Sequence, residues 1–483
     1  MSFVSDRILN RTAAWLMAFC GLAAAIASTA TILADERFVF LATGLWALAI
    51  VLLPLAMDRD YDLFSMWTFV LLTVLIGVTL RGACLSFGYP DADRLDQLYL
   101  LGREPAYFFG PAVWLLVGLL MLTLGFVAIG FRARPLISPS AEPHAGRLVA
   151  LGLVLLVVSA VATALYIQRT GGSALGDWSA KRTVIPDLDL EGAGYQSHGG
   201  LRFVASLAIF GHLLVLGQAL SPSTSGKNRT LLWILAIALL LVACVVPFYA
   251  SLRTTVAMNF AFSAAIVFYT GRRLRITVLL AMGIAVLLAV YLMTALRPTD
   301  HEVELATPTV GRVFQAAVIN RNQIELPKTA HILHAIPDEL PLQYGKTIAR
   351  WALAPIPRSL WPDKPVIPPG PKIGNTVYHQ RVAGVPPSLV AELFWNFHLP
   401  GVLIGAFGLG MLLRFLESRF RSPVGPGFLG AAVYIVGPMT MGFELVGGSI
   451  GSALFRAVLQ TVVMAGLLIL IRPNRVKSPS IPC

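Results

Sequence analysis

The sequence is poor in charged residues and in cysteine. Asp, Glu, Lys and Arg make up 13% of the 483 residues, whereas hydrophobic residues make up 56%. About a quarter of the residues of a soluble globular domain are charged, so this composition excludes that class. The chain has four cysteines, and none lies between residues 297 and 391, so the most polar part of the chain contains no disulfide framework.

Several catalytic patterns are also missing. No Gly-x-Ser-x-Gly elbow occurs with a credible triad, and no His, Cys and carboxylate cluster has zinc spacing. Tyr344-Gly-Lys-Thr347 lacks the upstream glycines of a P-loop. Asp58-Arg-Asp-Tyr-Asp62 looks like an acidic metal motif, but no soluble domain surrounds it, and we interpret it as a solvated turn. The sequence therefore predicts neither a metal site nor a cofactor.

Apolar runs long enough to cross a bilayer, about 20 residues each, recur along the chain. They lie near 12–33, 38–57, 63–85, 107–131, 147–168, 201–220, 230–250, 252–270, 276–296, 393–413, 427–446 and 449–471. Continuous apolar runs predict helices, because backbone groups in lipid must be satisfied within the segment. We expect an all-α polytopic integral membrane protein with about twelve transmembrane helices.

The basic residues of the short loops predict the orientation. Arg132, Arg134, Arg272 and Arg273 lie in alternate loops that share one side of the membrane, whereas the short turns on the other side are poor in basic residues. The positive-inside rule then places both termini in the cytoplasm. The net charge of +12 is spread over these loops and predicts no nucleic-acid partner.

This topology divides the chain into three parts. Residues 1–296 hold the first nine predicted helices, residues 297–392 form one large periplasmic loop, and residues 393–483 hold the last three helices and a cytoplasmic tail. The loop contains ten of the 37 Lys and Arg residues. A loop of this length is usually functional.

Five arginines lie where the positive-inside rule disfavours them. Arg81, Arg202, Arg253 and Arg297 occupy the outer ends of predicted helices, and Arg456 lies about two turns into the last one. Snorkelling of the guanidinium group to the interface explains any one of them. Ionisable residues in membrane segments also mark cavities and functional sites, and guanidinium groups bind phosphate oxygens bidentately. A rim of such residues would suit a lipid-linked pyrophosphate.

Acidic candidates are fewer. Glu444 lies at a depth similar to that of Arg456, which predicts either an ion pair or a catalytic carboxylate. Glu392, Asn396 and His398 cluster where the chain re-enters the membrane, and residues 392 and 396 share one helix face. A polar helix start explains this cluster as well as an active site does.

Prolines shape the end of the loop. Those at positions 355, 357, 362, 365, 368, 369 and 371 forbid a regular helix through this stretch. We expect an extended centre between short helices at Arg312–Ile319 and Gly345–Leu353. The segment should lie over the membrane helices as a lid that presents Arg358 and Lys364 toward them.

Three stretches of the loop carry a resemblance to a known family. They are Pro355-Ile-Pro-Arg358 with Trp361-Pro-Asp-Lys364-Pro, then Ile373-Gly-Asn375, then Glu392-Leu-Phe-Trp-Asn396-Phe-His-Leu-Pro-Gly401. Together they resemble the large-loop signature of bacterial oligosaccharide repeat-unit polymerases, the Wzy-type O-antigen and exopolysaccharide polymerases. Ser251-Leu-Arg253-Thr is similar to a Ser-x-Arg element of that family. His398 and Pro400 depart from the family pattern Asn-Phe-Gly-x-x-Gly at the membrane entrance.

The resemblance implies a membrane glycosyltransferase at the periplasmic face of the bacterial inner membrane. Its donor would be an oligosaccharide on undecaprenyl pyrophosphate, and its acceptor a hydroxyl of another lipid-linked unit. Fixed cations would stabilise the leaving pyrophosphate, and a general base would accept the hydroxyl proton. The candidate cations are Arg253, Arg297 and Arg358, with Lys364, Arg81 and Arg202 as further ligands, and the candidate bases are Glu392, His398 and Glu444.

Other functions fit the same architecture. A lipid-linked glycan ligase would attach finished chains to a different acceptor. A transporter or flippase should show inverted repeats and broken helices at the midplane, whereas this chain gathers its polar residues at one face. A scaffold for envelope assembly would not need arginines at the outer interface. A chain-length regulator protein is a further expected partner of a polymerase.

Overall fold

The protein is an all-α polytopic membrane protein. The computed structural model describes residues 11–58, 61–89, 91–130, 136, 143–170, 199–224, 226–250, 252–271, 276–295, 314, 318–319, 325–356, 360–361, 363–379, 384–421 and 427–471. Every regular element among these residues is a helix, and ten helices are long and apolar enough to cross a bilayer. The predicted fold class is confirmed.

The membrane helices and the short helices between them follow one another along the chain. The long helices are α1 (Arg11–Thr31), α2 (Val39–Met57), α3 (Met66–Val74) continuing through η2 (Leu75–Leu80) into α4 (Arg81–Phe87), α6 (Phe109–Ala128), α7 (Ala145–Arg169), α8 (Gly199–Leu220), α9 (Gly226–Tyr249), α10 (Arg253–Tyr269), α11 (Ile276–Ala295), α16 (Leu389–Pro400) continuing through η6 (Gly401–Gly405) into α17 (Ala406–Phe420), α18 (Leu429–Val436), α19 (Pro438–Gly447) and α20 (Ile450–Ile471). The short helices are η1 (Glu36–Phe38), α5 (Ala92–Leu95), η3 (Asp96–Leu100), η4 (Pro105–Phe108), α13 (Leu326–His334), α14 (Lys346–Ala349), η5 (Arg350–Leu353) and α15 (Gly370–Thr376).

Ten of the predicted spans coincide with helices that can cross a bilayer, and the other two coincide with α10 and α11. Helix α10 has 17 residues, and the apolar part of α11 is the shorter segment Leu280–Met293. A full crossing takes about 20 residues. The count of about twelve therefore stays a prediction.

The central membrane helices approach one another very closely. A Cβ atom at Gly410 would lie 2.1 Å from the carbonyl oxygen of Leu122, so only glycine fits where α17 crosses α6. Next to this crossing, the Trp67 ring packs against Phe126 with 4.5 Å between centroids, and the Trp67 indole donates to the Val51 carbonyl. These contacts join α2, α3, α6 and α17 into one packed unit.

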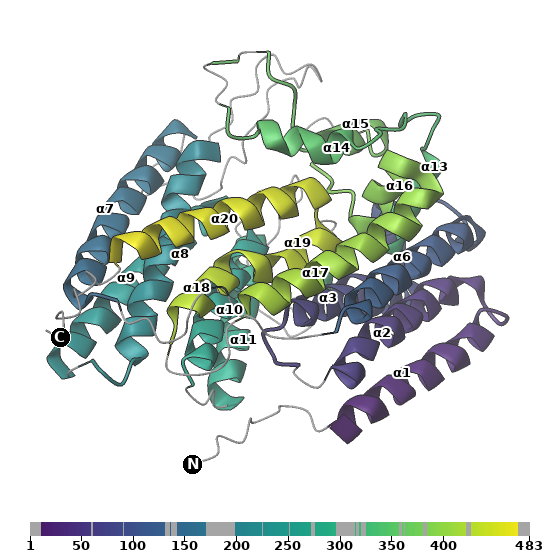
Figure 1. Ribbon diagram of the computed structural model, residues 1–483. Helices are drawn as coiled ribbons and strands as arrows, with labels where there is room; N and C mark the ends of the chain where they lie inside the picture. Colours follow the sequence, from purple (N-terminus) through teal and green to yellow (C-terminus); the bar gives the residue numbers. More distant parts are fainter. Residues whose placement is uncertain are drawn as a thin grey trace, which may run out of the picture.

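The described parts of the large loop pack on the membrane helices. Helices α13, α14 and α15 lie near the upper edge of Figure 1, where α13 and α14 contact α16 and α14 also contacts α20. We call this edge the loop end. The helix predicted at Gly345–Leu353 is present as α14 and η5, whereas only residues 314, 318 and 319 of the one predicted at Arg312–Ile319 are described, so that helix stays a prediction.

Candidate functional site

The helix that follows the loop is broken where it enters the bundle. His398 has φ 54° and ψ −146° inside α16. Pro400 has no N–H, so the Asn396 carbonyl lacks the donor that a regular helix would provide. The loop supplies replacements, because the backbone N–H groups of Gln343 and Tyr344 donate to the Trp395 and Asn396 carbonyls, each at 3.0 Å. Backbone donors of the loop therefore replace the hydrogen bonds that the break removes from α16.

Glu392 is the centre of a buried hydrogen-bond network. Its side chain is fully buried. One oxygen accepts the Thr347 hydroxyl at 2.8 Å and the Ser449 hydroxyl at 3.2 Å, and the other accepts the backbone N–H of Ile450 at 2.7 Å. Asn396 donates to the Thr347 hydroxyl at 2.7 Å. Glu392 thus caps the start of α20 and ties it to α14, which is a positioning role.

The loop also docks on α20 through a glycine. A Cβ atom at Gly451 would lie 2.2 Å from Cδ1 of Trp351, in η5. The Trp351 ring continues along the helix to Phe455, with 6.0 Å between centroids. The absence of a side chain at Gly451 therefore allows the loop to sit directly on the membrane helix.

Two cations proposed as pyrophosphate ligands instead bind other groups of the protein. Arg81 is buried and forms an ion pair with Glu325, and its Nε donates to the Val318 carbonyl at 3.0 Å. Lys364 is also buried, and its ammonium donates to the carbonyls of Ala354 and Ile356 at 3.1 and 2.7 Å. Both side chains hold the loop in place, and neither points its charge at open solvent.

Lys328 extends the buried cluster around Arg81. It lies on α13 and is 1% exposed. Burial first, and then the positive charge of Arg81, lower the pKa of Lys328 well below its ordinary value. This lysine was not a candidate from sequence, because nothing in its neighbourhood distinguishes it from an exposed loop lysine.

The remaining acidic and basic candidates differ in their surroundings. Glu444 pairs with Arg456 at 2.9 Å, with 51% of the arginine side chain and 22% of the carboxylate side chain exposed, so the predicted pair is present. His398 is exposed and stacks beside Phe394, with 4.3 Å between centroids. Arg253, the first residue of α10, and Arg202, in α8, are half-buried. Arg297 and Arg358 lie outside the described residues.

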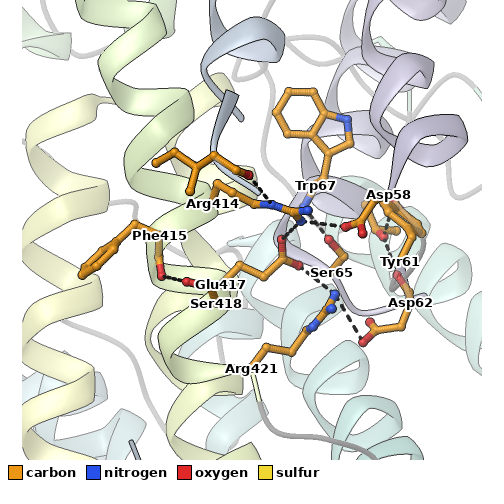
Figure 2. Close-up of polar contacts among 12 residues, drawn as sticks. Asp58, Tyr61, Asp62, Ser65, Trp67, Arg414, Phe415, Glu417, Ser418 and Arg421 are labelled. Atoms are coloured by element: carbon orange, nitrogen blue, oxygen red, sulfur yellow. Dashed lines mark hydrogen bonds and ion pairs between the residues drawn. The ribbon is translucent and has the colours of Figure 1, made fainter. Parts of the chain in front are cut away.

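A second cluster of charges lies where α2 ends and α17 ends (Figure 2). Arg414 pairs with Asp58 at 2.6 Å and with Glu417 at 3.4 Å, and Arg421 pairs with Glu417 at 3.2 Å and with Asp62 at 3.6 Å. Glu417 is fully buried and shared by both arginines. We call these five residues the ionic network. Asp58 and Asp62 are therefore ion-paired and not solvated, so the interpretation as a solvated turn is wrong for both residues, whereas residues 59 and 60 lie outside the described part of the chain.

Aromatic hydroxyls and a shifted carboxyl complete the ionic network. The Tyr269 hydroxyl donates to both oxygens of Asp62 at 3.3 and 3.2 Å. Burial, followed by the negative charge of Glu417, raises the pKa of Asp62 to about 6, although Arg421 opposes the shift. Burial also raises the pKa of Tyr61 far above its usual range. Two guanidinium groups thus offset two of the three carboxylate charges, and the raised pKa of Asp62 lets the third carboxyl group take up a proton in mildly acidic solution.

Comparison with known proteins assigns no family or function to this site. A scan against protein-family models, a search of curated proteins and a search of solved structures each gave no match. The part of the chain that the structure describes also contains no group of three or more His, Cys, Asp or Glu residues arranged to hold a metal ion.

Sequence reasoning missed the partners of Glu392. Thr347, Ser449 and Ile450 lie 45, 57 and 58 residues away along the chain. Thr347 belongs to the segment that fails as a P-loop, and no local pattern links it to the start of α16. The one available signal was the departure from glycine at position 398, where the backbone adopts a conformation that glycine favours.

Proposed function

We propose that the protein is a membrane glycosyltransferase that joins oligosaccharide repeat units carried on undecaprenyl pyrophosphate. The observation that carries the proposal is the way the polymerase-like stretches fold. Ile373 is buried in α15, Lys364 anchors the proline-rich segment, and Glu392 and Asn396 bind Thr347 and the start of α20. Residues that resemble the family signature thus gather at the loop end, against the membrane helices. A loop that only connected two helices would not need this buried polar framework.

The reaction requires one bond to break and one to form. The bond between the anomeric carbon and the pyrophosphate oxygen breaks, and its electron pair stays on the leaving pyrophosphate. An acceptor hydroxyl oxygen forms the new glycosidic bond and gives its proton to a base. Cations fixed near the pyrophosphate lower the barrier, because negative charge grows there in the transition state.

The described geometry favours His398 and Glu444 over Glu392 as the general base. All three donors to Glu392 come from the protein itself, and its side chain has no exposure, so we assign it a positioning role. His398 is exposed at the helix break and suits proton transfer from a bound hydroxyl. Glu444 has one oxygen committed to Arg456. His398 is therefore our preferred base, with Glu444 as the alternative.

The proposal includes an orientation. The loop end faces the periplasm, both termini are cytoplasmic, and the ionic network lies at the cytoplasmic side of the inner membrane. A chain-length regulator protein is a further proposed partner. A reporter fused within residues 300–390 should then be periplasmic, and reporters at Gly226 or Gly271 should be cytoplasmic; the reverse result would remove the proposed reaction from its lipid-linked substrate.

The cations are tested by conservative substitution. Arg253→Lys and Arg358→Lys keep the charge but lose the planar fork that binds two phosphate oxygens, and we expect both to impair polymerisation. Arg253→Ala and Arg358→Ala should lower the rate further, by about 3 kcal/mol in barrier height. Full-length polymer in cells carrying either alanine variant, at normal protein abundance, would exclude that residue as a pyrophosphate ligand.

The glycan pool of a deletion strain tests the function itself. Deletion should leave single repeat units on undecaprenyl pyrophosphate at the periplasmic face, and the plasmid-borne wild-type gene should restore long chains. Long lipid-linked chains in the deletion strain would instead indicate a ligase. Single units trapped in the cytoplasmic leaflet would indicate a flippase. An unchanged pool would reject a role in this reaction.

A further inference from the structure

The exposure of α16 changes abruptly at its break. Residues 389–396 are all buried, whereas Phe397 and His398 are exposed. Just beyond the break, Leu403 is 41% exposed and Ile404 is 74% exposed. An exposed surface therefore begins at the break and continues along the apolar part of the membrane span.

The loop adds an aromatic residue to this surface. The backbone N–H of Tyr344 donates to the Asn396 carbonyl at 3.0 Å, and a Cβ atom at Gly345 would lie 3.1 Å from Cζ of Phe397. These contacts hold the loop against the helix at its break. Tyr344 is nevertheless 72% exposed and Phe397 46% exposed. The two residues, which we call the aromatic pair, are therefore exposed neighbours at the break.

The aromatic pair lies near one boundary of the hydrocarbon core. Between Glu392 and Arg414 the chain contains no Asp, Glu, Lys or Arg. This stretch has about the 20 residues that one crossing needs, so the core begins shortly after Glu392 and includes Phe397. Non-helical backbone at this depth is tolerated only where it packs against protein or lines a cavity. The loop at Tyr344 meets this condition through its hydrogen bond to α16, and its exposed ring is left to face the membrane.

We propose that the aromatic pair binds the first isoprene units of the lipid-linked substrate. The assignment rests on the proposed function for the identity of that lipid. Its pyrophosphate is joined to isoprene units with flat carbon–carbon double bonds, which pack against aromatic faces through dispersion. His398, the preferred base, directly follows Phe397 and is exposed, so the reacting sugar and its pyrophosphate must lie close to this surface. The aromatic pair then lies where the lipid chain leaves the pyrophosphate and enters the bilayer.

Photocrosslinking identifies the lipid that covers the aromatic pair. Aromatic residues at the interface also contact ordinary phospholipids, so the experiment offers both kinds of lipid. Tyr344 is replaced by the photoreactive residue p-benzoylphenylalanine in the full-length protein. The protein is placed in nanodiscs of phosphatidylcholine with a small fraction of undecaprenyl pyrophosphate and irradiated, and the lipid adducts are identified by mass spectrometry.

A control position corrects for the reactivity of the two lipids. Leu165 receives the same photoreactive residue, because it is 40% exposed near the end of α7, which lies apart from α16 in Figure 1. We expect the ratio of polyprenyl to phosphatidylcholine adducts to be about tenfold higher at position 344, the enrichment that about 1.4 kcal/mol of preference gives. Equal ratios at the two positions would overturn the proposal.

Matched substitutions test the second member of the aromatic pair. In the crosslinking protein, Phe397→Ala should lower the polyprenyl adduct severalfold. Phe415→Ala should leave it unchanged, because Phe415 has the same 46% exposure but lies near the other end of the span Leu389–Phe420. An unchanged thermal midpoint shows that both variants are folded. Equal adducts in the two folded variants would exclude Phe397 from the site.

Competing alcohols test whether the isoprene chain itself is bound. Undecaprenol has this chain without the phosphates, and its addition should reduce the polyprenyl adduct at position 344. The same amount of a saturated long-chain alcohol should leave the adduct unchanged. Equal protection by the two alcohols would overturn the proposal, since the surface would then take any apolar chain.

The outcome is separable from that of the proposed function. If polyprenyl adducts are enriched at position 344 but gene deletion leaves the glycan pool unchanged, the lipid-chain site is correct and the polymerase function is wrong. If deletion accumulates single repeat units but the adduct ratios at the two positions are equal, the function stands and the lipid-chain site is wrong.

Discussion

The ionic network and the loop end hold buried carboxyl groups with different kinds of partner. In the ionic network, Arg414 and Arg421 share Glu417 and reach the two carboxyl groups at the end of α2. At the loop end, buried Glu392 accepts only from neutral groups, the Thr347 and Ser449 hydroxyls and the backbone N–H of Ile450. In the ionic network every charged group has a partner of opposite charge, which holds the ends of α2 and α17 together. At the loop end, neutral donors fix the carboxyl group and tie the loop to the start of α20.

The other arginines can also be distinguished by the partners of their side chains. Arg81 lies at the outer end of a predicted helix, as a pyrophosphate ligand should, but Glu325 already neutralises it. Arg456 is half exposed and pairs with Glu444. Position along a membrane helix therefore does not separate a structural arginine from a binding one. The partner of the side chain does, and only the tertiary structure reveals that partner.

The largest expected effect comes from breaking the ionic network. Glu417→Gln removes the charge shared by two buried guanidinium groups, and we expect a loss of about 3–5 kcal/mol of stability. The measurement is the thermal midpoint of the purified protein, together with its abundance in membranes. Glu36→Gln is the control, because Glu36 is exposed in the short helix η1. A midpoint equal to that of the control would show that the ionic network does not hold the helices.

Substitution of Glu392 should give the next largest loss of stability, and it tests whether this residue positions the loop or acts as the base. Glu392→Gln and Thr347→Val should each destabilise the protein by about 1–3 kcal/mol, because each leaves a buried polar group without its partner. In a double-mutant cycle the two changes should be less than additive, since they remove one shared hydrogen bond. Thr376→Val, in α15, is the control. Lost polymerisation with unchanged stability in Glu392→Gln alone would instead make Glu392 the catalytic base.

A smaller effect, of opposite sign, is expected at the helix break. His398→Gly should raise stability by about 1 kcal/mol, because φ 54° with ψ −146° is strained for any residue with a side chain. His398→Ala keeps the strain and should not raise the thermal midpoint. If His398 is the base, both variants lose polymerisation. Full activity in the stabilised glycine variant would transfer that role to Glu444.

The smallest effect should appear only as a pH dependence. The pKa of Asp62 is raised from 3.8 to about 6, so between these values the folded protein holds a proton that the unfolded chain has released. Stability should therefore fall as pH rises from about 4 to about 6, and this contribution should be flat above that range. Asp62→Asn should remove the change of the thermal midpoint with pH over this range. A wild-type slope of the opposite sign would contradict the raised pKa.

Much of the membrane architecture was predictable, and for a simple reason. A bilayer imposes one length and one composition on every crossing helix, so local runs such as residues 145–169 are sufficient to place it. The helix over Gly345–Leu353 was also predictable, because the prolines begin after it. These properties are local in sequence.

The sites were less predictable because their contacts are not local. Asp58 and Arg414 are 356 residues apart, and the arginines of α17 had already been assigned to the topology pattern of basic loops, so the acidic turn was left without partners. Thr347 and Glu392 are 45 residues apart, and only the docking of α14 on α16 brings them together.

Polymerisation by the purified protein tests the central claim most directly. The wild type and the Arg253→Ala/Arg358→Ala double variant are each supplied with single repeat units on undecaprenyl pyrophosphate, extracted from the deletion strain, and the products are separated by length. We predict a ladder of longer glycans with the wild type and only single units with the folded double variant. No ladder from the wild type, or an equal ladder from the double variant, would contradict the account.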